Sequence, residues 1–340
     1  MNSDIEFDGK SILITGGTGS FGQRMVRTLL ENHKPKRLIV FSRDELKQFE
    51  MAQKFPESKY PALRYFIGDV RDRARIMRAC HDVDVIIHAA AMKQIVAAEY
   101  NPTECIATNV MGAQNIIDAA IENGVARVMA LSTDKAANPI NLYGATKLCS
   151  DKLFIAANNL SGKVKTRFSI VRYGNVIGSR GSVIPFFKSC VAEGRLNLPI
   201  TDPEMTRFVI TLDQGVDFVL QMLAGMIGGE VFVPKLPSIK VIDLVPLISP
   251  GAEVEHVGIR PGEKLHEVMI PLEDSRNSYD FGSHYVLAPQ HVWWNNSAFE
   301  ALVADQAKDV TVAFEYSSGT NDWWLASSEL QDLVDSVPTP

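Results

Sequence analysis

Residues 11–30 read SILITGGTGSFGQRMVRTLL and decide the fold of this chain. A short β-branched run is followed at once by a glycine-rich segment, and the glycines lead into a helical pattern. Glycines in such a turn let the backbone approach a pyrophosphate, which then binds the free N–H groups at the start of the helix. The stretch therefore predicts a dinucleotide-binding loop. The residues expected at the phosphates are Gly16, Thr18, Gly19, Ser20, Phe21 and Gly22.

The chain continues this alternation up to about residue 177, as is typical of a parallel sheet covered on both faces. Beyond Val176 the pattern becomes irregular and richer in proline and glycine. We expect a doubly wound α/β Rossmann sheet in residues 1–176, completed by about 206–235. A smaller mixed α/β substrate-binding part is expected in 177–205 and 236–340. The six expected strands span residues 12–14, 38–41, 64–67, 85–88, 127–131 and 167–172.

The composition limits the partners of the chain. Of its 340 residues, 46% are hydrophobic and 22% are charged, as in ordinary globular proteins. The net charge of −6 argues against nucleic-acid binding through a broad basic face. The four cysteines and seven histidines show no metal-ligand spacing, and neither a signal peptide nor a membrane-spanning stretch is evident. We expect a cytoplasmic protein that binds small molecules and no metal. A packed cap is expected from Trp293, Trp294, Trp323 and Trp324.

The segment after the second expected strand bears on the choice between NADP and NAD. It delivers Ser42 and Arg43, whose hydroxyl and guanidinium groups suit a 2′-phosphate through charge-assisted hydrogen bonds. An NAD site would place a carboxylate there, and because Asp44 and Glu45 follow closely, NAD stays open as an alternative. NADP is the expected cofactor. Its further expected contacts are Lys47, Asp69, Val70, Ala89, Ala90 and Ala91.

Two short motifs near the fifth expected strand carry candidate catalytic side chains. Tyr143 and Lys147 stand one helical turn apart and therefore share a helix face. The lysine charge and a nearby nicotinamide would lower the pKa of the phenol, so that it can take a proton from a substrate hydroxyl. Thr133, Asp134 and Lys135 follow the strand directly, at the edge of the sheet where open α/β folds bind ligands. We expect these five side chains to form the catalytic group.

These motifs resemble a known family. They lie at 15–22, 41–47, 93, 98–102, 131–147, 173–182, 202–207 and 258–264. They are similar to those of the extended short-chain dehydrogenases/reductases and, within these, of the configuration-inverting UDP-N-acetylglucosamine 4,6-dehydratases. The triplet from Thr133 to Lys135 is the most specific element, because related retaining dehydratases carry glutamate where Lys135 stands and 4-epimerases lack the acid and base pair.

The resemblance implies a reaction without net redox change. The sugar is oxidised at carbon 4, which makes the proton at carbon 5 acidic; water then leaves across carbons 5 and 6, and hydride returns to carbon 6. The product would be a UDP-2-acetamido-2,6-dideoxy-4-hexulose. Lys135 is the expected base at carbon 5, kept neutral for part of the time by burial or by Lys147. Asp134 is the expected acid for the leaving hydroxyl, helped by Thr133.

The same resemblance implies binding residues and a setting for the reaction. It places Lys93 and Asn175 at the substrate, UDP-N-acetylglucosamine, and Arg207 and Arg260 near the substrate's diphosphate. Family members form homo-oligomers, so that a dimer or hexamer is expected. Their products feed pseudaminic acid and related surface glycans, including those of flagellin.

Three other functions stay open from the residues alone. A UDP-sugar 4-epimerase would share Tyr143 and Lys147, although it would leave Asp134 and Lys135 without a task. A catalytically silent NADP-binding regulator on the same fold would have no need of the Tyr143 and Lys147 pair. A plain alcohol dehydrogenase for a small substrate is disfavoured by the long carboxyl-terminal part.

Overall fold

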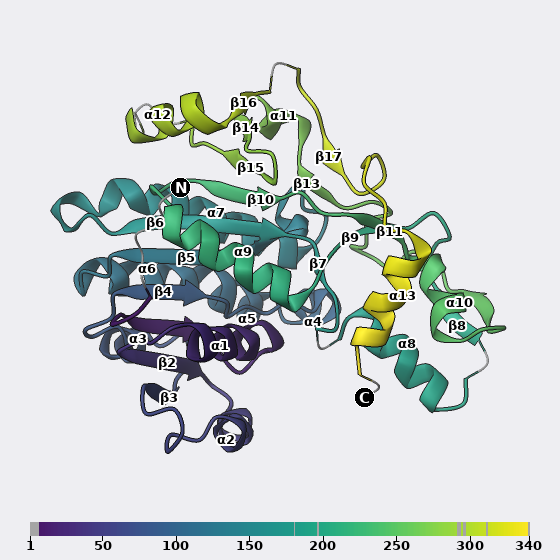
Figure 1. Cartoon of the computed structure of the whole chain (residues 1–340), viewed down its shortest axis with the longest axis horizontal. Coiled ribbons are helices and arrows are strands. Elements are labelled where there is room, and N and C mark those ends of the chain that lie inside the picture. Colours follow the sequence, from purple (N-terminus) through teal and green to yellow (C-terminus); the bar gives the residue numbers. More distant parts are fainter. Residues whose placement is uncertain are drawn as a thin grey trace.

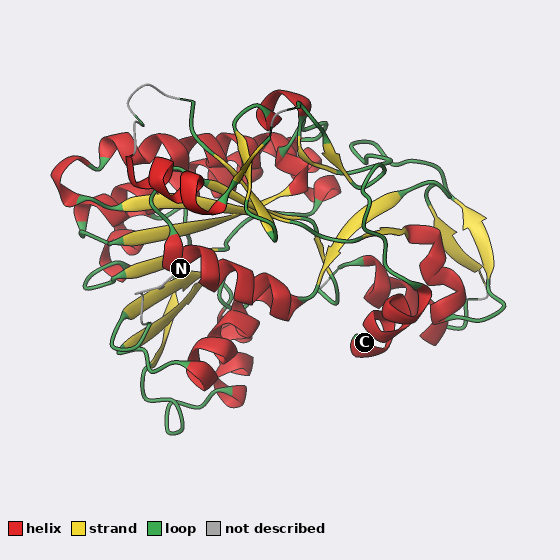
Figure 2. Cartoon of the chain, turned by 45° about the horizontal axis from the view of Figure 1, so that its top comes forward, coloured by secondary structure: helices red, strands yellow, loops and turns green. Residues whose placement is uncertain are grey.

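The computed structural model describes residues 7–179, 181–195, 197–290, 294, 297–310 and 312–338. A large, mostly parallel sheet occupies its centre, with helices on both faces (Figures 1 and 2). All six strands expected from the sequence are present, and they pair in parallel in the order β6-β5-β4-β1-β2-β3, which confirms the doubly wound fold. These strands are β1 (Ser11–Thr15), β2 (Arg37–Ser42), β3 (Leu63–Ile67), β4 (Val85–His88), β5 (Arg127–Thr133) and β6 (Arg167–Tyr173).

The helices bury the apolar faces of this sheet. Helix α1 packs against α9, and α6 packs against both α3 and α7. Ile12, Leu13 and Ile14 in β1 are completely buried between the layers, and each such side chain stabilises the fold by roughly 1.5–3 kcal/mol. The helices beside the sheet are α1 (Ser20–Asn32), α2 (Glu45–Lys54), α3 (Arg73–Ala79), α4 (Ile95–Tyr100), α5 (Pro102–Ile106), α6 (Gly112–Glu122), α7 (Leu142–Leu160) and α9 (Leu212–Gly225).

The sheet extends further than expected from the sequence. Strand β10 (Val231–Pro234) pairs in parallel with β6, and β15 (His284–Leu287) pairs antiparallel with β10. Strands β14 (Ser278–Asp280) and β16 (Lys308–Asp309) complete the edge. Val286 and Leu287 of β15 join the main core. The structure therefore differs from the expectation that all of residues 236–340 belong to the substrate-binding part.

A smaller lobe beside the sheet has its own core (Figure 1). Ile184, Phe187, Leu198, Leu244 and Leu330 are buried there. Its strands are β7 (Asn175–Val176), β8 (Asn197–Ile200), β9 (Thr206–Ile210), β11 (Ser238–Lys240) and β12 (Glu253–His256). Its helices are α8 (Val183–Ala192), α10 (Leu244–Ile248) and α13 (Ser327–Ser336). Strand β13 (Val268–Ile270) pairs with β17 (Tyr316–Ser317), and α11 (Leu272–Ser275) and α12 (Ser297–Gln306) lie near the sheet edge.

The expected tryptophan cap is wrong in part. The Trp294 indole packs against Phe299 and donates to the Gly228 carbonyl at 2.6 Å, but Trp323 and Trp324 are 50% and 40% exposed. Trp293 lies outside the described residues. A search of the described part of the chain finds no helix both long and apolar enough to span a membrane.

Candidate active site

A cavity of about 710 Å³ opens at the carboxyl ends of the central strands. All of the residues predicted to contact the cofactor line it, as do the five predicted catalytic residues, Lys93 and Asn175. Arg207 and Arg260 are not among the described residues that line the cavity. The motifs found along the first half of the sequence are thus brought together in one place.

The glycine loop packs against neighbouring backbone too closely to hold a side chain at two of its positions. Gly16 has a φ of +66°, and a Cβ there would stand 2.9 Å from the backbone nitrogen of Ala90. A Cβ on Gly22 would lie 2.5 Å from the Cα of Gly17. Gly19 is the N-cap of α1 and has no side chain with which to cap the first N–H groups. The loop therefore fits a dinucleotide phosphate at the positive end of the helix.

The other end of the cavity carries the charges expected near the ribose. The Arg43 side chain is 61% exposed and lies 3.9 Å from an Asp69 oxygen. Although burial opposes the effect, hydrogen bonds from Arg71 lower the pKa of Asp69. Asp44 caps α2 by accepting from the Lys47 backbone N–H at 3.0 Å, and its other oxygen lies 2.5 Å from the Lys47 ammonium. Asp44 is therefore engaged in local contacts.

The catalytic triplet forms a hydrogen-bonded chain at the end of β5. The Thr133 hydroxyl donates to Asp134 Oδ1 at 2.8 Å, and a hydrogen bond also joins Thr133 to the phenol of Tyr143. Lys135 Nζ donates to the same Asp134 oxygen at 3.0 Å. The second oxygen, Asp134 Oδ2, has no hydrogen-bond partner among the residues that the structure describes. A buried carboxylate with a free oxygen is costly, so this chain of contacts is unlike an ordinary helix cap.

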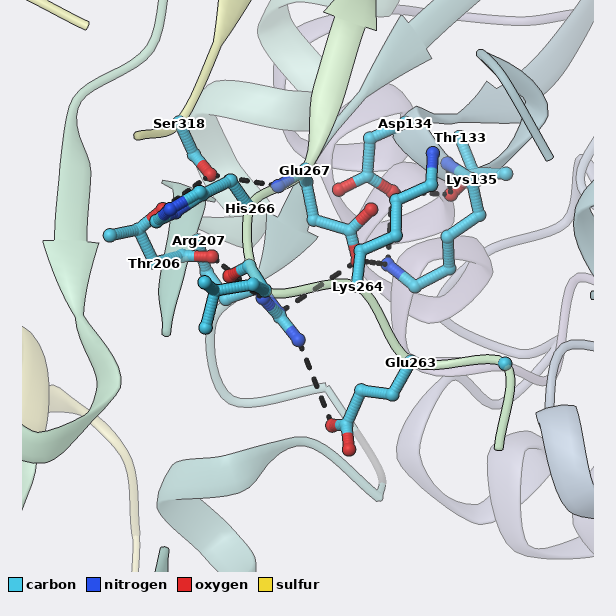
Figure 3. A network of polar contacts seen from close by, with 12 residues as sticks. Thr133, Asp134, Lys135, Thr206, Arg207, Glu263, Lys264, His266, Glu267 and Ser318 are labelled. Carbon is cyan, nitrogen blue, oxygen red and sulfur yellow. Dashed lines mark hydrogen bonds and ion pairs between the residues drawn. The ribbon is translucent and has the colours of Figure 1, made fainter. Parts of the chain in front are cut away.

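The charge on Lys135 differs from the expectation. Burial disfavours the ammonium, but Asp134 and Glu267 outweigh it and raise the pKa of Lys135 above its usual range. Glu267 Oε1 lies 3.1 Å from Lys135 Nζ, and its carboxylate is drawn close to that of Asp134 (Figure 3). The expectation that burial or Lys147 keeps the amine neutral is not met in this structure, because a second carboxylate, Glu267, lies beside the ammonium.

The surroundings of Tyr143 also differ from the expectation. Burial raises the pKa of the Tyr143 phenol to about 12, and the groups that oppose this are the Lys135 charge and the Thr133 hydroxyl. Lys147 instead interacts with Asp151, which accepts a hydrogen bond from Ser132 Oγ at 2.7 Å. Burial lowers the pKa of Lys147. In this structure the Lys135 charge opposes the rise in the Tyr143 pKa, and the effect predicted for Lys147 beside a nicotinamide stays a prediction.

The two predicted diphosphate arginines lie elsewhere. Arg207 is 7% exposed, and its guanidinium lies 3.7 Å from Glu263 and 3.8 Å from Glu267. Arg260 is exposed on the loop before β13. Lys93, by contrast, lines the cavity, where burial and then the Lys135 charge lower its pKa. Of the four predicted substrate residues, Lys93 and Asn175 thus line the cavity, and their contact with a substrate stays a prediction.

Sequence reasoning missed two buried carboxylates. Asp151 stands four residues after Lys147 on α7, so that helical spacing could have identified it. Glu267 is distant in sequence from every catalytic motif, and no local pattern points to it. Within the described residues, no group of histidine, cysteine, aspartate and glutamate side chains could hold a metal ion.

Comparison with known proteins identifies relatives over nearly the whole chain. A family model described as polysaccharide biosynthesis protein matches residues 12–289. An inverting UDP-N-acetylglucosamine 4,6-dehydratase of Campylobacter jejuni is 54% identical over 330 residues, which cover 96% of this chain and 98% of the relative.

Solved structures show the same architecture. Pen from Bacillus thuringiensis superposes with a TM-score of 0.87 and 35% identity, covering 98% of this chain and 99% of that one. DesIV, a dTDP-glucose 4,6-dehydratase from Streptomyces venezuelae solved with NAD bound, has a TM-score of 0.67 and 26% identity, covering 75% and 86%.

Proposed function

Since this chain belongs to the polysaccharide biosynthesis protein family, within the extended short-chain dehydrogenases/reductases, we propose that it is a 5-inverting UDP-N-acetylglucosamine 4,6-dehydratase. It is then a hydro-lyase that forms UDP-2-acetamido-2,6-dideoxy-4-hexulose. The observation that carries the proposal is the contact of Asp134 with Lys135 in the same cavity as Tyr143 and Lys147. An epimerase needs only the latter two residues, whereas loss of water needs an acid and a base as well.

The residues of the chain have distinct tasks in this proposal. When bound, NADP supplies reversible hydride acceptance next to sugar carbon 4. Tyr143 takes the proton of the carbon 4 hydroxyl, and the Lys135 charge favours the phenolate that this requires. Lys93 and Asn175 line the cavity and orient the sugar.

One proton transfer prepares the elimination. If the proton of Lys135 moves to Asp134 across their 3.0 Å contact, the amine becomes a base and the carboxyl an acid in the same step. Lys135 then removes the carbon 5 proton while Asp134 protonates the leaving hydroxyl. Both side chains thereby regain the charges that they have in the resting structure.

The position of Thr133 suggests how the site resets. At the end of a turnover Tyr143 holds the proton of the carbon 4 hydroxyl, Asp134 has given its proton to water, and Lys135 has returned one to carbon 5. Thr133 is hydrogen-bonded to both Tyr143 and Asp134, so its hydroxyl can pass the Tyr143 proton to Asp134, from which it returns to Lys135 across their contact. The number of protons on the enzyme is then the same before and after the reaction.

We propose NADP rather than NAD as the cofactor. Arg43 is an exposed guanidinium at the edge of the cavity, where a 2′-phosphate would add charge-assisted hydrogen bonds. Asp44, the carboxylate that would favour NAD, caps α2 and pairs with Lys47. We also propose, from the family resemblance, a cytoplasmic homo-oligomer whose product feeds pseudaminic acid or related surface and flagellar glycans.

The decisive experiment is incubation of the purified protein with NADP and UDP-N-acetylglucosamine. We expect a product that has lost one water, with inverted configuration at carbon 5 by NMR. A product of unchanged mass with galacto configuration would establish the epimerase. Retention of NADP without turnover would favour the silent regulator.

A further inference from the structure

Glu267 is a buried carboxylate in contact with the Lys135 ammonium. Lys135 lines the cavity, whereas Glu267 is not among the described residues that do so. Glu267 is 2% exposed and precedes β13, on a segment that follows the small lobe in the chain, while Lys135 follows β5 of the main sheet (Figure 3). The two side chains meet with Oε1 and Nζ 3.1 Å apart.

The backbone of Glu267 is fixed on both sides. Its N–H donates to Ser318 Oγ at 2.9 Å, and its carbonyl accepts from the Ser318 N–H at 2.8 Å. The Ser318 hydroxyl also contacts Thr206 Oγ1 at 2.7 Å. The second carboxylate oxygen, Glu267 Oε2, is buried without a hydrogen-bond partner in the described part of the chain. A carboxylate left partly unsatisfied in this way is a poor device for stability, so a functional role explains it better.

Arg207 is a second and more distant cation next to Glu267. Its Nε lies 3.8 Å from Glu267 Oε1, farther than Lys135 does, and its Nη2 lies 3.7 Å from Glu263. Arg207 also donates to the carbonyl of Thr206 at 2.7 Å. Arg207 is thus shared between Glu263 and Glu267, while Lys135 is the nearer ion-pair partner of Glu267.

We propose that Glu267 is a positioning residue that fixes the Lys135 amine in the cavity wall and strengthens it as a base for the removal of the carbon 5 proton. The inference rests on the proposed function. As the proton moves from carbon 5 to Nζ, positive charge grows on Lys135 next to the Glu267 carboxylate, which stabilises that charge.

The need for Glu267 follows from the task of Asp134. Asp134 must carry a proton before it can protonate the leaving hydroxyl. Asp134 is therefore neutral at the moment when Lys135 removes the carbon 5 proton. At that moment, Glu267 is the carboxylate that remains charged among the described ion-pair partners of Lys135. The titratable and charged groups facing Lys135 are Asp134, Glu267, Arg207, Lys93, Lys264 and Tyr143.

The test measures the protonation of Lys135 without any substrate. The holoenzyme is labelled with acetic anhydride over a range of pH, and acylation of Lys135 is followed by peptide mass spectrometry, with the exposed Lys54 as the reference within each sample. We expect Glu267→Gln to move the pH of half-labelling of Lys135 down by about one unit or more. Glu267→Asp should give a smaller shift. Glu263→Gln, which neutralises the other carboxylate next to Arg207, should give none.

Kinetics provide the second measurement. With UDP-N-acetylglucosamine, Glu267→Gln should lower kcat for dehydration about tenfold or more, with KM changed by less than about threefold and carbon 4 oxidation retained. Glu267→Asp should restore part of the rate. Unchanged labelling of Lys135 in Glu267→Gln would overturn the inference. An equal loss of oxidation and dehydration would also overturn it, because that result indicates a structural role for Glu267.

The outcomes separate this inference from the proposed function. If the wild type does not dehydrate UDP-N-acetylglucosamine, the proposed function fails, whereas the labelling shift still tests the action of Glu267 on Lys135. If Glu267→Gln does not fold, Glu267→Asp carries the test, and unchanged labelling and kcat in that variant would overturn the inference.

Discussion

Asp134 Oδ1 lies 3.0 Å from Lys135 Nζ, while Asp134 Oδ2 has no hydrogen-bond partner in the described part of the chain. In the proposed mechanism, Asp134 takes a proton from Lys135 across this contact, and the carboxyl group then protonates the leaving hydroxyl. A change of Asp134 should therefore impair the elimination and not the oxidation that precedes it, because Tyr143 and Lys147 stay in place.

Asp134→Asn should therefore uncouple the two steps. The amide has nearly the same shape but cannot deliver a carboxyl proton, so we expect water loss to slow by about 10²–10⁴-fold. Oxidation at carbon 4 should persist within about tenfold, because Tyr143 and Lys147 are intact. Product mass and single-turnover absorbance at the nicotinamide band report the two steps. Water loss at the wild-type rate would contradict the role of Asp134 as the acid.

Gly16→Ala should weaken cofactor binding. The new Cβ would stand 2.9 Å from the Ala90 nitrogen at a φ of +66°. Backbone displacement together with left-handed strain should cost about 1–3 kcal/mol and raise the Kd for NADP at least about tenfold. Gly9→Ala is the matched control, because Gly9 has a φ of +72° and nothing within 4 Å of a Cβ. If calorimetry gave equal losses of NADP affinity in the two variants, the clash of the new Cβ with the Ala90 backbone would not be their cause.

Arg43→Ala should change the preference between cofactors. Loss of a charge-assisted contact with the 2′-phosphate should raise the Kd for NADP about tenfold or more and leave the Kd for NAD within about twofold. Arg64→Ala serves as the control, since Arg64 donates to the carbonyls of Pro61 and Leu63 and does not line the cavity among the described residues. A parallel loss of both affinities would contradict NADP selection by Arg43.

The sequence predicted the parts of the molecule that depend on local patterns. The six parallel strands follow from short β-branched runs, and the glycine loop follows from its place between β1 and α1. Tyr143 and Lys147 were found because helical spacing is visible in the sequence. These features depend on neighbours along the chain.

The charge state of the site could not be predicted in the same way. Lys135 is held by Glu267, which belongs to a distant segment, and the same carboxylate contacts Arg207. Likewise, β15 joins the sheet by pairing with β10, which depends on where the chain returns rather than on either strand alone. Long-range pairing decided both features, and neither leaves a periodic signal.

Buried His88 should make the folded protein sensitive to acid. Its Nδ1 lies 2.8 Å from Thr15 Oγ1, and burial, with a smaller effect from the Lys147 charge, lowers the pKa of His88 to about 3. In the unfolded chain the same group titrates near 6.5. Between these values the unfolded state binds more protons, so the stability due to His88 is complete above pH 6.5 and is lost as the pH falls toward 3.

We expect His88 to account for a loss of about 3 kcal/mol in the free energy of unfolding between pH 7 and pH 4. His88→Gln should remove most of that dependence in urea titrations at the two pH values, whatever its effect at pH 7. His81→Gln is the control, because the His81 side chain is 78% exposed. An identical loss of stability on acidification in His88→Gln and wild type would show that other groups, such as His284, whose pKa burial lowers to about 4, carry the effect.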